Sequence, residues 1–323
     1  KMATTTSITS TYAGEFAGKY ISAALLSGVT LDRGGIEIKP NVKFKEVIKK
    51  LATSSDLIAD GSCDFSATST ITLTERILQP EEFQVNLQLC KQDFRSDWEA
   101  VQMGYSAFDN LPPKFSDYLI GHVSGLVAEK TENNIWQGNL GGAQAGEFNG
   151  IATLAAADSD VIDVAGATVT SSNVIAELGK IVDAVPSALY GKEDLFIYVS
   201  QNIARAYIRA LGGFGILKNA AGSENVSDIG ANGVNGQGTM WWQNGALSFD
   251  GVNLFVANGL PDNYAVAAQK SNLFFGTGLL SDHNEVKVID MADLDGSQNV
   301  RVVMRFTSGV QYGLGTEIVL YSS

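Results

Sequence analysis

A long helical pattern in residues 112 to 151 constrains the fold more than any other stretch, because it stops at a tryptophan and gives way to glycine. Two prolines at its start favour a helix beginning there, and Ser116 is a candidate N-cap. After Trp136, a glycine-rich run that begins at Gly138 denies the helix any continuation. The pattern predicts one helix over residues 112 to 137, supported by apolar residues at helical spacing: Phe115, Leu119, Val123 and Leu126.

Three residues of this helix are candidates for close packing. Gly121 and Gly125 each cost about 1 kcal/mol relative to alanine in a helix interior, so their presence favours a face that packs closely against something. Trp136 is placed to fold back on the last helical turn. We therefore expect the helix to be a structural backbone element.

The N-terminal third has strand patterning. Residues 3 to 11 are too polar to pack a core and are expected to form an arm, and residues 12 to 26 have helical spacing. Alternation in residues 36 to 45 predicts strands joined by a turn at Pro40-Asn41, and a second strand set follows in residues 65 to 89. Such a ribbon is marginal alone and leaves exposed edges, so it requires a partner surface.

The rest of the chain alternates helices and strands and then becomes almost all strand. Residues 92 to 108 are expected to form a short helix, and residues 171 to 185 an amphipathic helix ended by Pro186. A buried strand at 194 to 200 and a helix at 201 to 211 predict a small α/β domain, with residues 212 to 245 as an exposed loop system. Six strand patterns fill residues 246 to 323.

Charge and hydropathy exclude some function classes. The net charge of −13 disfavours a general nucleic-acid-binding surface. Eight of the 22 basic residues nevertheless fall in the first 50 positions. The lysine cluster at residues 39 to 50 could be a solvated face or touch nucleic acid, but contact with acidic surfaces of a sister subunit is favoured. No run approaches 18 uninterrupted apolar residues, and no signal-peptide pattern is present, so no membrane association is expected.

Catalytic motifs are lacking. The two histidines, His122 and His283, have no metal-site or catalytic context, and no nucleophile elbow or credible phosphate loop occurs. Cys63 and Cys90 belong to no CxxC pair and are expected to be free thiols. The run DMADLDGSQN at 290 to 299 could offer oxygens to a divalent cation, but a hairpin turn explains the same residues and is favoured. We expect no enzyme activity, no cofactor and no metal.

The order of these elements resembles the major capsid proteins of tailed bacteriophages, the Hong Kong 97-type shell fold. The resemblance covers nearly the whole chain, but its motifs are diffuse. The stretches closest to a signature are NNIWQGN to FNGI, at the helix end, and LFIYVSQNIARAYI.

The resemblance implies an α+β fold divided into five segments. Residues 1–30 would be an N-arm, 31–75 an extended E-loop β-ribbon, and 76–164 a peripheral domain with a spine helix at 112–137. Residues 165–260 would be an axial α/β domain, and 261–323 would return as strands to the peripheral domain.

The same resemblance implies a function. The chain would assemble with itself, as hexamers and pentamers, into an icosahedral head shell around packaged double-stranded DNA, which its inner face would meet without sequence recognition. Portal and scaffolding or decoration proteins would be its partners, and it would assemble in the host bacterial cytoplasm and reside in the virion capsid. Two alternatives are an encapsulin-type compartment around a cargo enzyme and a soluble enzyme whose glycine-rich loops form a lid.

A shell subunit needs surfaces that stay incomplete until neighbours cover them. Charge reversal at Lys43, Lys45 and Lys49 is expected to weaken assembly, and leucine at Gly121 or Gly125 to stop it if these glycines mark close packing. The candidate inter-subunit contacts are Lys39, Lys43, Lys45, Lys49, Lys50, Ile36, Ile38, Phe44, Gly121, Gly125 and Trp136.

Overall fold

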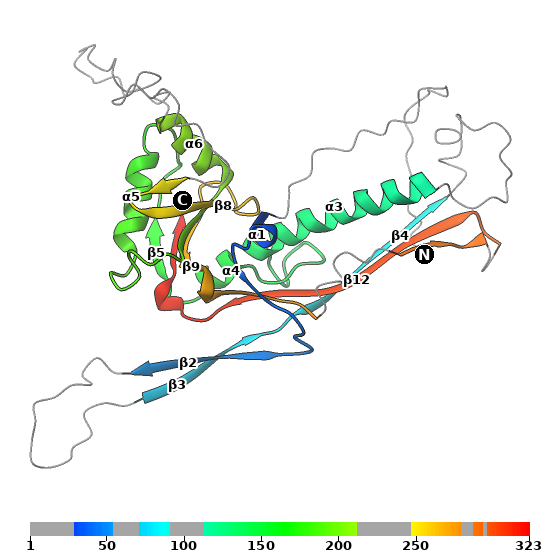
Figure 1. Cartoon of the computed structure of the whole chain (residues 1–323), viewed down its shortest axis with the longest axis horizontal. Helices are drawn as coiled ribbons and strands as arrows, with labels where there is room; N and C mark the ends of the chain where they lie inside the picture. Colours follow the sequence, from blue (N-terminus) through cyan, green and yellow to red (C-terminus); the bar gives the residue numbers. More distant parts are fainter. Residues whose placement is uncertain (1–28, 54–70, 91–112, 212–246, 279–286, 293–295) are drawn as a thin grey trace, which may run out of the picture.

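The computed structural model describes residues 29–53, 71–90, 113–211, 247–278, 287–292 and 296–323. In these ranges the fold is α+β, with helices, two larger sheets and a two-stranded ribbon. Figure 1 shows a body of helices and sheet, a long helix and long strands extending from it to one side, and the ribbon projecting below. The predicted arm, the helices at 12–26 and 92–108, the loop system at 212–245, Cys63, His283, Asp293 and Asp295 lie outside the described ranges.

The body is built on a six-stranded sheet whose strand order is β5-β13-β9-β6-β8-β7. Helices α5 (Val174–Ala184) and α6 (Gln201–Leu211) cover one face, and α4 (Ile151–Ala156) and the end of α3 (Pro113–Gln137) lie against the other. Burial on both faces explains the continuous apolar run of β6. The strands are β5 (Ile162–Ala165), β6 (Leu195–Val199), β7 (Ser248–Phe249), β8 (Val252–Val256), β9 (Ala265–Gln269) and β13 (Val319–Ser322).

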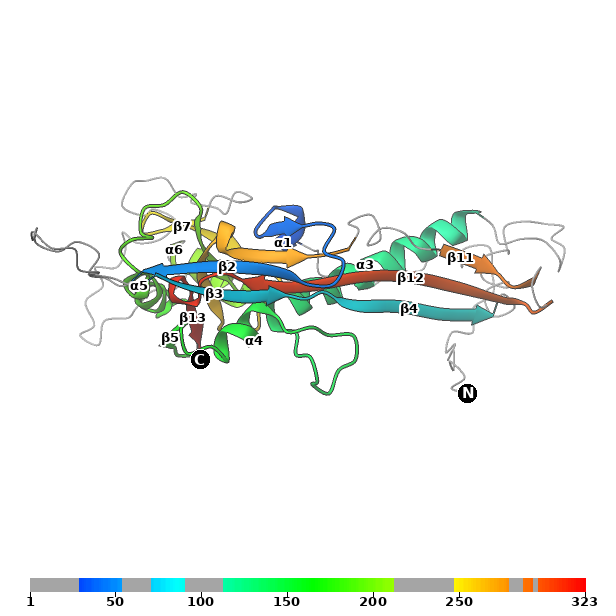
Figure 2. The same cartoon turned by 90° about the horizontal axis from the view of Figure 1, so that it is seen from below.

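The second sheet supports the long helix. Its strand order is β1-β10-β12-β11, and β4 pairs with β12 along the edge opposite to β11. Val123 of α3 packs on Val302 of β12, so the helix lies along this sheet, as Figures 1 and 2 show. The strands are β1 (Glu37–Lys39), β4 (Glu81–Cys90), β10 (Leu273–Gly276), β11 (Lys287–Asp290) and β12 (Asn299–Tyr312); a short helix α1 (Val29–Asp32) and the 3-10 turns η1 (Lys270–Asn272) and η3 (Gly315–Glu317) complete the described elements.

The main helical predictions are confirmed. Helix α3 begins at Pro113. Proline is favoured at this position because the first turn of a helix does not use the backbone amide proton that proline lacks. Ser116 therefore lies inside the helix, and its predicted role as N-cap is wrong. Helices α5 and α6 and strand β6 occupy the predicted ranges, and β11 and β12 pair antiparallel as expected for a hairpin across residues 291 to 298.

The ribbon differs from its predicted extent. It consists of β2 (Glu46–Thr53) and β3 (Ile71–Leu78), which pair antiparallel. Residues 37–39 instead form β1, which pairs parallel with β10 of the body, and residues 42–45 are not a strand. Asn41 has a positive φ of 66°, but residues 40–43 are assigned no turn, and the Asn41 amide donates to Gly278 O, which ties this segment to the body.

The strands near the C-terminus are divided between the two sheets. Strands β9 and β13, which fall within the predicted segment 261–323, lie in the six-stranded sheet beside β6 and β5. Every residue of β9 is buried, which suits a central strand covered on both faces. Only β10, β11 and β12 join the sheet under α3. Of the helices described, none is long and apolar enough to cross a membrane.

Candidate assembly interface

The ribbon presents an apolar face to solvent. In the register of the two strands Val47 lies opposite Ile77, and strand alternation places Ile71 and Leu73 on the same side as Ile77. Ile71 and Leu73 are 65% and 66% exposed, and Val47 and Ile77 are both 44% exposed. A row of large apolar side chains on a projecting two-stranded element is typical of a surface that another molecule covers.

The lysine cluster overlaps this face, because Lys49 lies on the same side of β2 as Val47, but its members differ in availability. Lys43, Lys45 and Lys49 are exposed, and Lys49 lies opposite Glu75 in the ribbon register. Lys39 is engaged within its own chain, because its Nζ bonds Glu46 Oε1 at 2.6 Å and lies 4.7 Å from the Phe274 ring centroid. The exposed basic side chains of this region are therefore Lys43, Lys45 and Lys49.

Two more predicted contact residues belong to the ribbon region. Phe44 is 71% exposed, and the Nζ atom of Lys45 lies 5.2 Å from its ring centroid. Lys50 is half-buried. Phe44 therefore adds an aromatic group to the exposed apolar surface.

The base of the ribbon is fixed by a polar cluster. The Arg76 guanidinium of β3 pairs with Asp158 and lies 4.5 Å from the centroid of the Tyr312 ring, whose hydroxyl donates to Asp158 Oδ2 at 2.8 Å. Next to it, the buried side chain of Leu78 packs on Gly276, where an added Cβ would lie 2.9 Å from it. These contacts join the ribbon, β12 and the segment after α4, and so set where the ribbon leaves the body.

This cluster predicts a pH dependence of stability. Burial raises the pKa of Asp158, but hydrogen bonds from the Asp160 amide, Tyr312 and Arg76 outweigh it and hold the pKa below the ordinary value of 3.8. A carboxyl group with a lowered folded pKa stabilises the fold above its unfolded pKa, and that contribution is lost as the pH falls through the folded value. In acid titrations followed by circular dichroism, Asp158→Asn should lower stability at pH 7 and flatten its fall below about pH 4. A variant whose acid unfolding curve superimposes on the wild-type curve would contradict this role.

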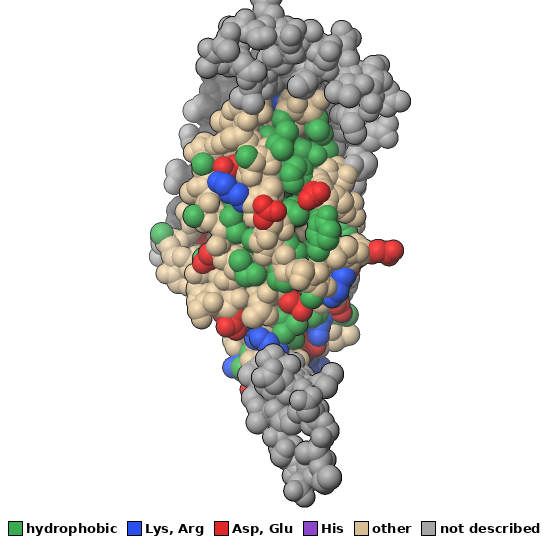
Figure 3. All heavy atoms as spheres, turned by 90° about the vertical axis from the view of Figure 1, so that its left-hand side faces the viewer, with side chains coloured by type: hydrophobic (Ala, Val, Ile, Leu, Met, Phe, Trp, Pro, Cys, Tyr) green, Lys and Arg blue, Asp and Glu red, His purple; other side chains and the backbone are tan. Residues whose placement is uncertain are grey.

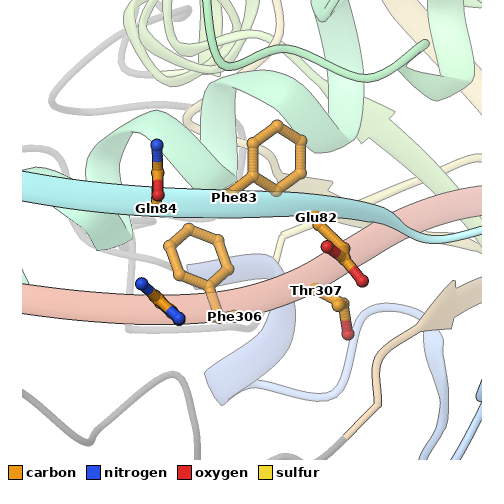
Figure 4. Close-up of a pocket in the computed structure, with 6 residues that line it drawn as sticks. Glu82, Phe83, Gln84, Phe306 and Thr307 are labelled. Carbon is orange, nitrogen blue, oxygen red and sulfur yellow. The ribbon is translucent and has the colours of Figure 1, made fainter.

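A hollow of about 610 Å³ is lined by the paired strands β4 and β12, close to where the ribbon starts. The rings of Phe83 and Phe306 are 5.6 Å apart, and Figure 4 shows both on one side of the strands, with Glu82 and Thr307 on the other. The hollow is lined by Glu82, Phe83, Gln84, Arg305, Phe306 and Thr307.

The end of α3 forms a buried joint. Trp136 is fully buried; its Nε1 donates to Thr30 Oγ1 at 2.9 Å, and its ring centroid is 5.0 Å from that of Tyr198. The amide and hydroxyl of Thr30 both donate to the Glu132 carboxylate, and burial raises the pKa of this carboxyl group above its ordinary range. Trp136 is therefore a core residue of the single chain that attaches α1 to α3.

Close packing at this joint depends on glycines other than those predicted. A Cβ added at Gly138 would lie 2.2 Å from Phe148 O, one at Gly150 would lie 2.5 Å from the Trp136 carbonyl carbon, and one at Gly259 would lie 2.1 Å from Glu132 O. A Cβ at Gly121 would meet nothing within 4 Å. Gly121 is thus not held close to any described part of its own chain.

The remaining predicted contacts divide into core and surface positions. Ile36 is buried in the core cluster that contains Trp136, and the half-buried Ile38 packs against the same cluster. Ile36 is therefore a core residue of the single chain, because β1 joins the body rather than the ribbon. Gly125 is half-buried. Sequence reasoning missed Leu73 and Ile77 as exposed positions, although their alternation with Thr72 and Arg76 marks them as one face of a strand.

Comparison with solved structures shows that the fold is that of phage capsid chains. A chain from Gordonia phage Cozz has 13% identity and a TM-score of 0.60, and the match covers 94% of this chain and 89% of that one. The capsid of Myoviridae phage XM1 gives 13% identity, a TM-score of 0.57 and 94% coverage of both chains. The capsid of the native GTA particle gives 12% identity and a TM-score of 0.58, and the match covers 94% of this chain and 93% of that one. No protein-family model and no curated protein sequence matches the chain.

The match confirms the resemblance noted from the sequence. It extends over nearly the whole of each chain. At such low identity it shows the fold alone. A function must be argued from the surfaces described above.

Proposed function

We propose that this chain is the major capsid protein of a tailed phage and assembles with itself into an icosahedral head shell. The observation that supports this proposal most directly is a ribbon with four large exposed apolar side chains on a chain that has the fold of phage capsids. A subunit whose apolar surface is incomplete gains its stability from neighbours. Many such contacts in a closed symmetric particle hold it together more firmly than any one contact could.

In this proposal the parts of the fold take the roles that the sequence implied. The ribbon β2–β3 acts as the extended E-loop and α3 as the spine helix of a peripheral domain. The six-stranded sheet with α5 and α6 forms the core of the axial domain, and residues 1–30 act as an N-arm. Strands β9 and β13 pair in the six-stranded sheet, whereas β10, β11 and β12 pair in the other sheet. The proposed axial domain therefore also takes strands from beyond residue 260.

The partners follow from the same proposal. Copies of the chain form hexamers and pentamers, portal and scaffolding or decoration proteins complete the head, and packaged DNA meets the inner face without sequence recognition. The shell assembles in the host bacterial cytoplasm. We infer that the chain is a structural protein rather than an enzyme; the matched capsid structures do not favour the encapsulin or lid-enzyme alternatives.

Negative-stain imaging of the purified full chain tests this function. Closed shells or capsomer-like rings are expected, because the ribbon face requires neighbours. Particles large enough for a phage genome would favour the head shell, whereas small particles filled with a cargo enzyme would favour the encapsulin alternative. A monodisperse single subunit with ligand-dependent melting would contradict both shell functions.

Charge reversal of the exposed lysines should weaken assembly. The variant Lys43→Glu, Lys45→Glu, Lys49→Glu places acidic groups on the only strongly basic part of the described ribbon region, in a chain whose net charge is −13. We expect a drop in particle yield on the order of tenfold at low salt, because the new charges repel acidic surfaces of neighbours. Yield is measured by sedimentation.

The matched control is Lys39→Gln, since Lys39 already bonds Glu46 within its own chain. It should lower particle yield less than the triple variant does. Normal particles from the triple variant would count against electrostatic contacts through these lysines.

A further inference from the structure

The two ends of the six-stranded sheet carry different and complementary surfaces. Strand β5 is at one edge, with α5 packed over it, while β8 and β7 are at the other edge, beside α6. Because the two surfaces are at opposite edges of one sheet, neither can cover the other within a single chain.

The α6 edge has a shallow apolar pocket with a basic rim. Its volume is about 260 Å³, and Ile208 and Val256 contribute its apolar lining. Arg205 is exposed at the rim and donates to Gln201 Oε1 at 3.1 Å, while Gln201 Nε2 donates to Asn258 Oδ1 at 3.0 Å. Arg209, one turn further along, is also exposed, and α6 contains no acidic residue. The pocket can therefore take an apolar side chain that has an acidic neighbour.

The α5 edge offers that combination. Ile175 is 54% exposed, and Gly179 and Asp183 follow it at four-residue spacing along the same side of the helix. Asp183 is exposed, as is Asp163 on β5, whereas Lys180 is paired with Glu177 at 2.9 Å. Figure 3 looks at this side of the molecule and shows hydrophobic side chains gathered on it with acidic side chains among them. This edge is therefore apolar with an acidic border.

We propose that the α6 pocket of one copy receives the α5 edge of a second copy, with Ile175 in the pocket and Asp163 and Asp183 facing Arg205 and Arg209. The contact joins different surfaces of the two copies, so it repeats head to tail and closes a ring when the rotation between copies divides a full turn. It rests on the proposed function, and it names the surfaces by which subunits form rings. The ribbon is left free for other contacts.

Two charge-reversed variants test the interface. The α6 variant, Arg205→Glu with Arg209→Glu, makes both edges acidic, and the α5 variant, Asp163→Lys with Asp183→Lys, makes both edges basic. Each alone should lose ring formation on the order of tenfold or more, because like charges then meet. Mixing the two should restore rings in which the variants alternate, and such rings can hold only an even number of copies. The matched control, Asp32→Lys with Glu37→Lys, reverses two exposed acidic residues on α1 and β1 that are not among the proposed contact residues, and it should assemble normally.

A cross-linking measurement identifies the contact directly. In chains with Cys63→Ser and Cys90→Ser, an Ile175→Cys chain is mixed with an Ile208→Cys chain under mild oxidation. A disulfide-linked dimer is expected in the mixture and not in either chain alone. Image analysis of the same samples reports on the shell.

The outcomes separate the interface from the function. Closed shells without the cross-link, and with both charge-reversed variants assembling normally, would overturn the interface and leave the shell function standing. Cross-linked rings that never close into particles would support the interface and contradict the shell function. A chain that forms neither rings nor particles would overturn both.

Discussion

The variant Ile71→Asp with Leu73→Asp should abolish shell assembly while leaving the subunit folded. Both side chains are about two-thirds exposed in the single chain, so aspartate costs little there. Against a neighbour, each change removes about 1.5–3 kcal/mol of apolar burial and adds an unpaired carboxylate. The loss recurs at every copy of the contact in a shell. Particle yield is measured by sedimentation, and folding of the soluble fraction by circular dichroism.

The control for this variant is Leu140→Asp. Leu140 is 52% exposed and lies in the loop after α3, away from the ribbon, so it matches the change in chemistry without touching the proposed contact. Its particles should form in normal yield. Full-yield shells from the ribbon variant would show that this face is not a contact between subunits.

Replacement of Trp136 should produce the largest loss of stability in the subunit. Trp136→Ala removes a fully buried indole, its hydrogen bond to Thr30 and its ring contact with Tyr198. Truncating a buried aromatic side chain costs about 3–5 kcal/mol, and the Glu132 carboxylate beside it would become less well packed. Urea unfolding should be measured in the assembly-blocked ribbon variant, so that the free energy of unfolding refers to one subunit.

Gln137→Ala is the matched control, because Gln137 is the next residue of the same helix end and is exposed. It should change the free energy of unfolding by less than about 0.5 kcal/mol. A loss of under about 1 kcal/mol for Trp136→Ala would mean that the joint between α1 and α3 contributes little to the fold.

Local pattern was sufficient for the elements whose signals lie within one stretch. The helix start at the prolines, the stop after Trp136, and the α5–β6–α6 unit depend on residue spacing and on proline and glycine positions that neighbouring residues supply. The alternation near Ile36 was also correctly interpreted as strand for residues 37–39. Its sheet partner was wrong, because pairing with β10 is a long-range choice that alternation does not encode.

The candidate interface was harder to predict for the same reason. Exposure of Leu73 and burial of Ile36 follow from which surface each strand packs on, and both residues are apolar members of an alternating run. Trp136 was read as a contact because its hydrogen-bond partner, Thr30, lies 106 residues away in the sequence. Gly259 likewise depends on a backbone approach to Glu132, which is far away in the sequence, whereas Gly138 and Gly150 approach Phe148 and Trp136 within one stretch of the chain.

Sedimentation velocity of the purified full-length chain tests the central claim most directly. A shell-forming subunit should sediment as particles much larger than one 34.3 kDa chain, with at most rings and single subunits as slower species. The fast species should disappear in the Ile71→Asp, Leu73→Asp variant and persist in Leu140→Asp. A wild-type chain that remains a single 34.3 kDa species across protein concentration and salt would contradict the account.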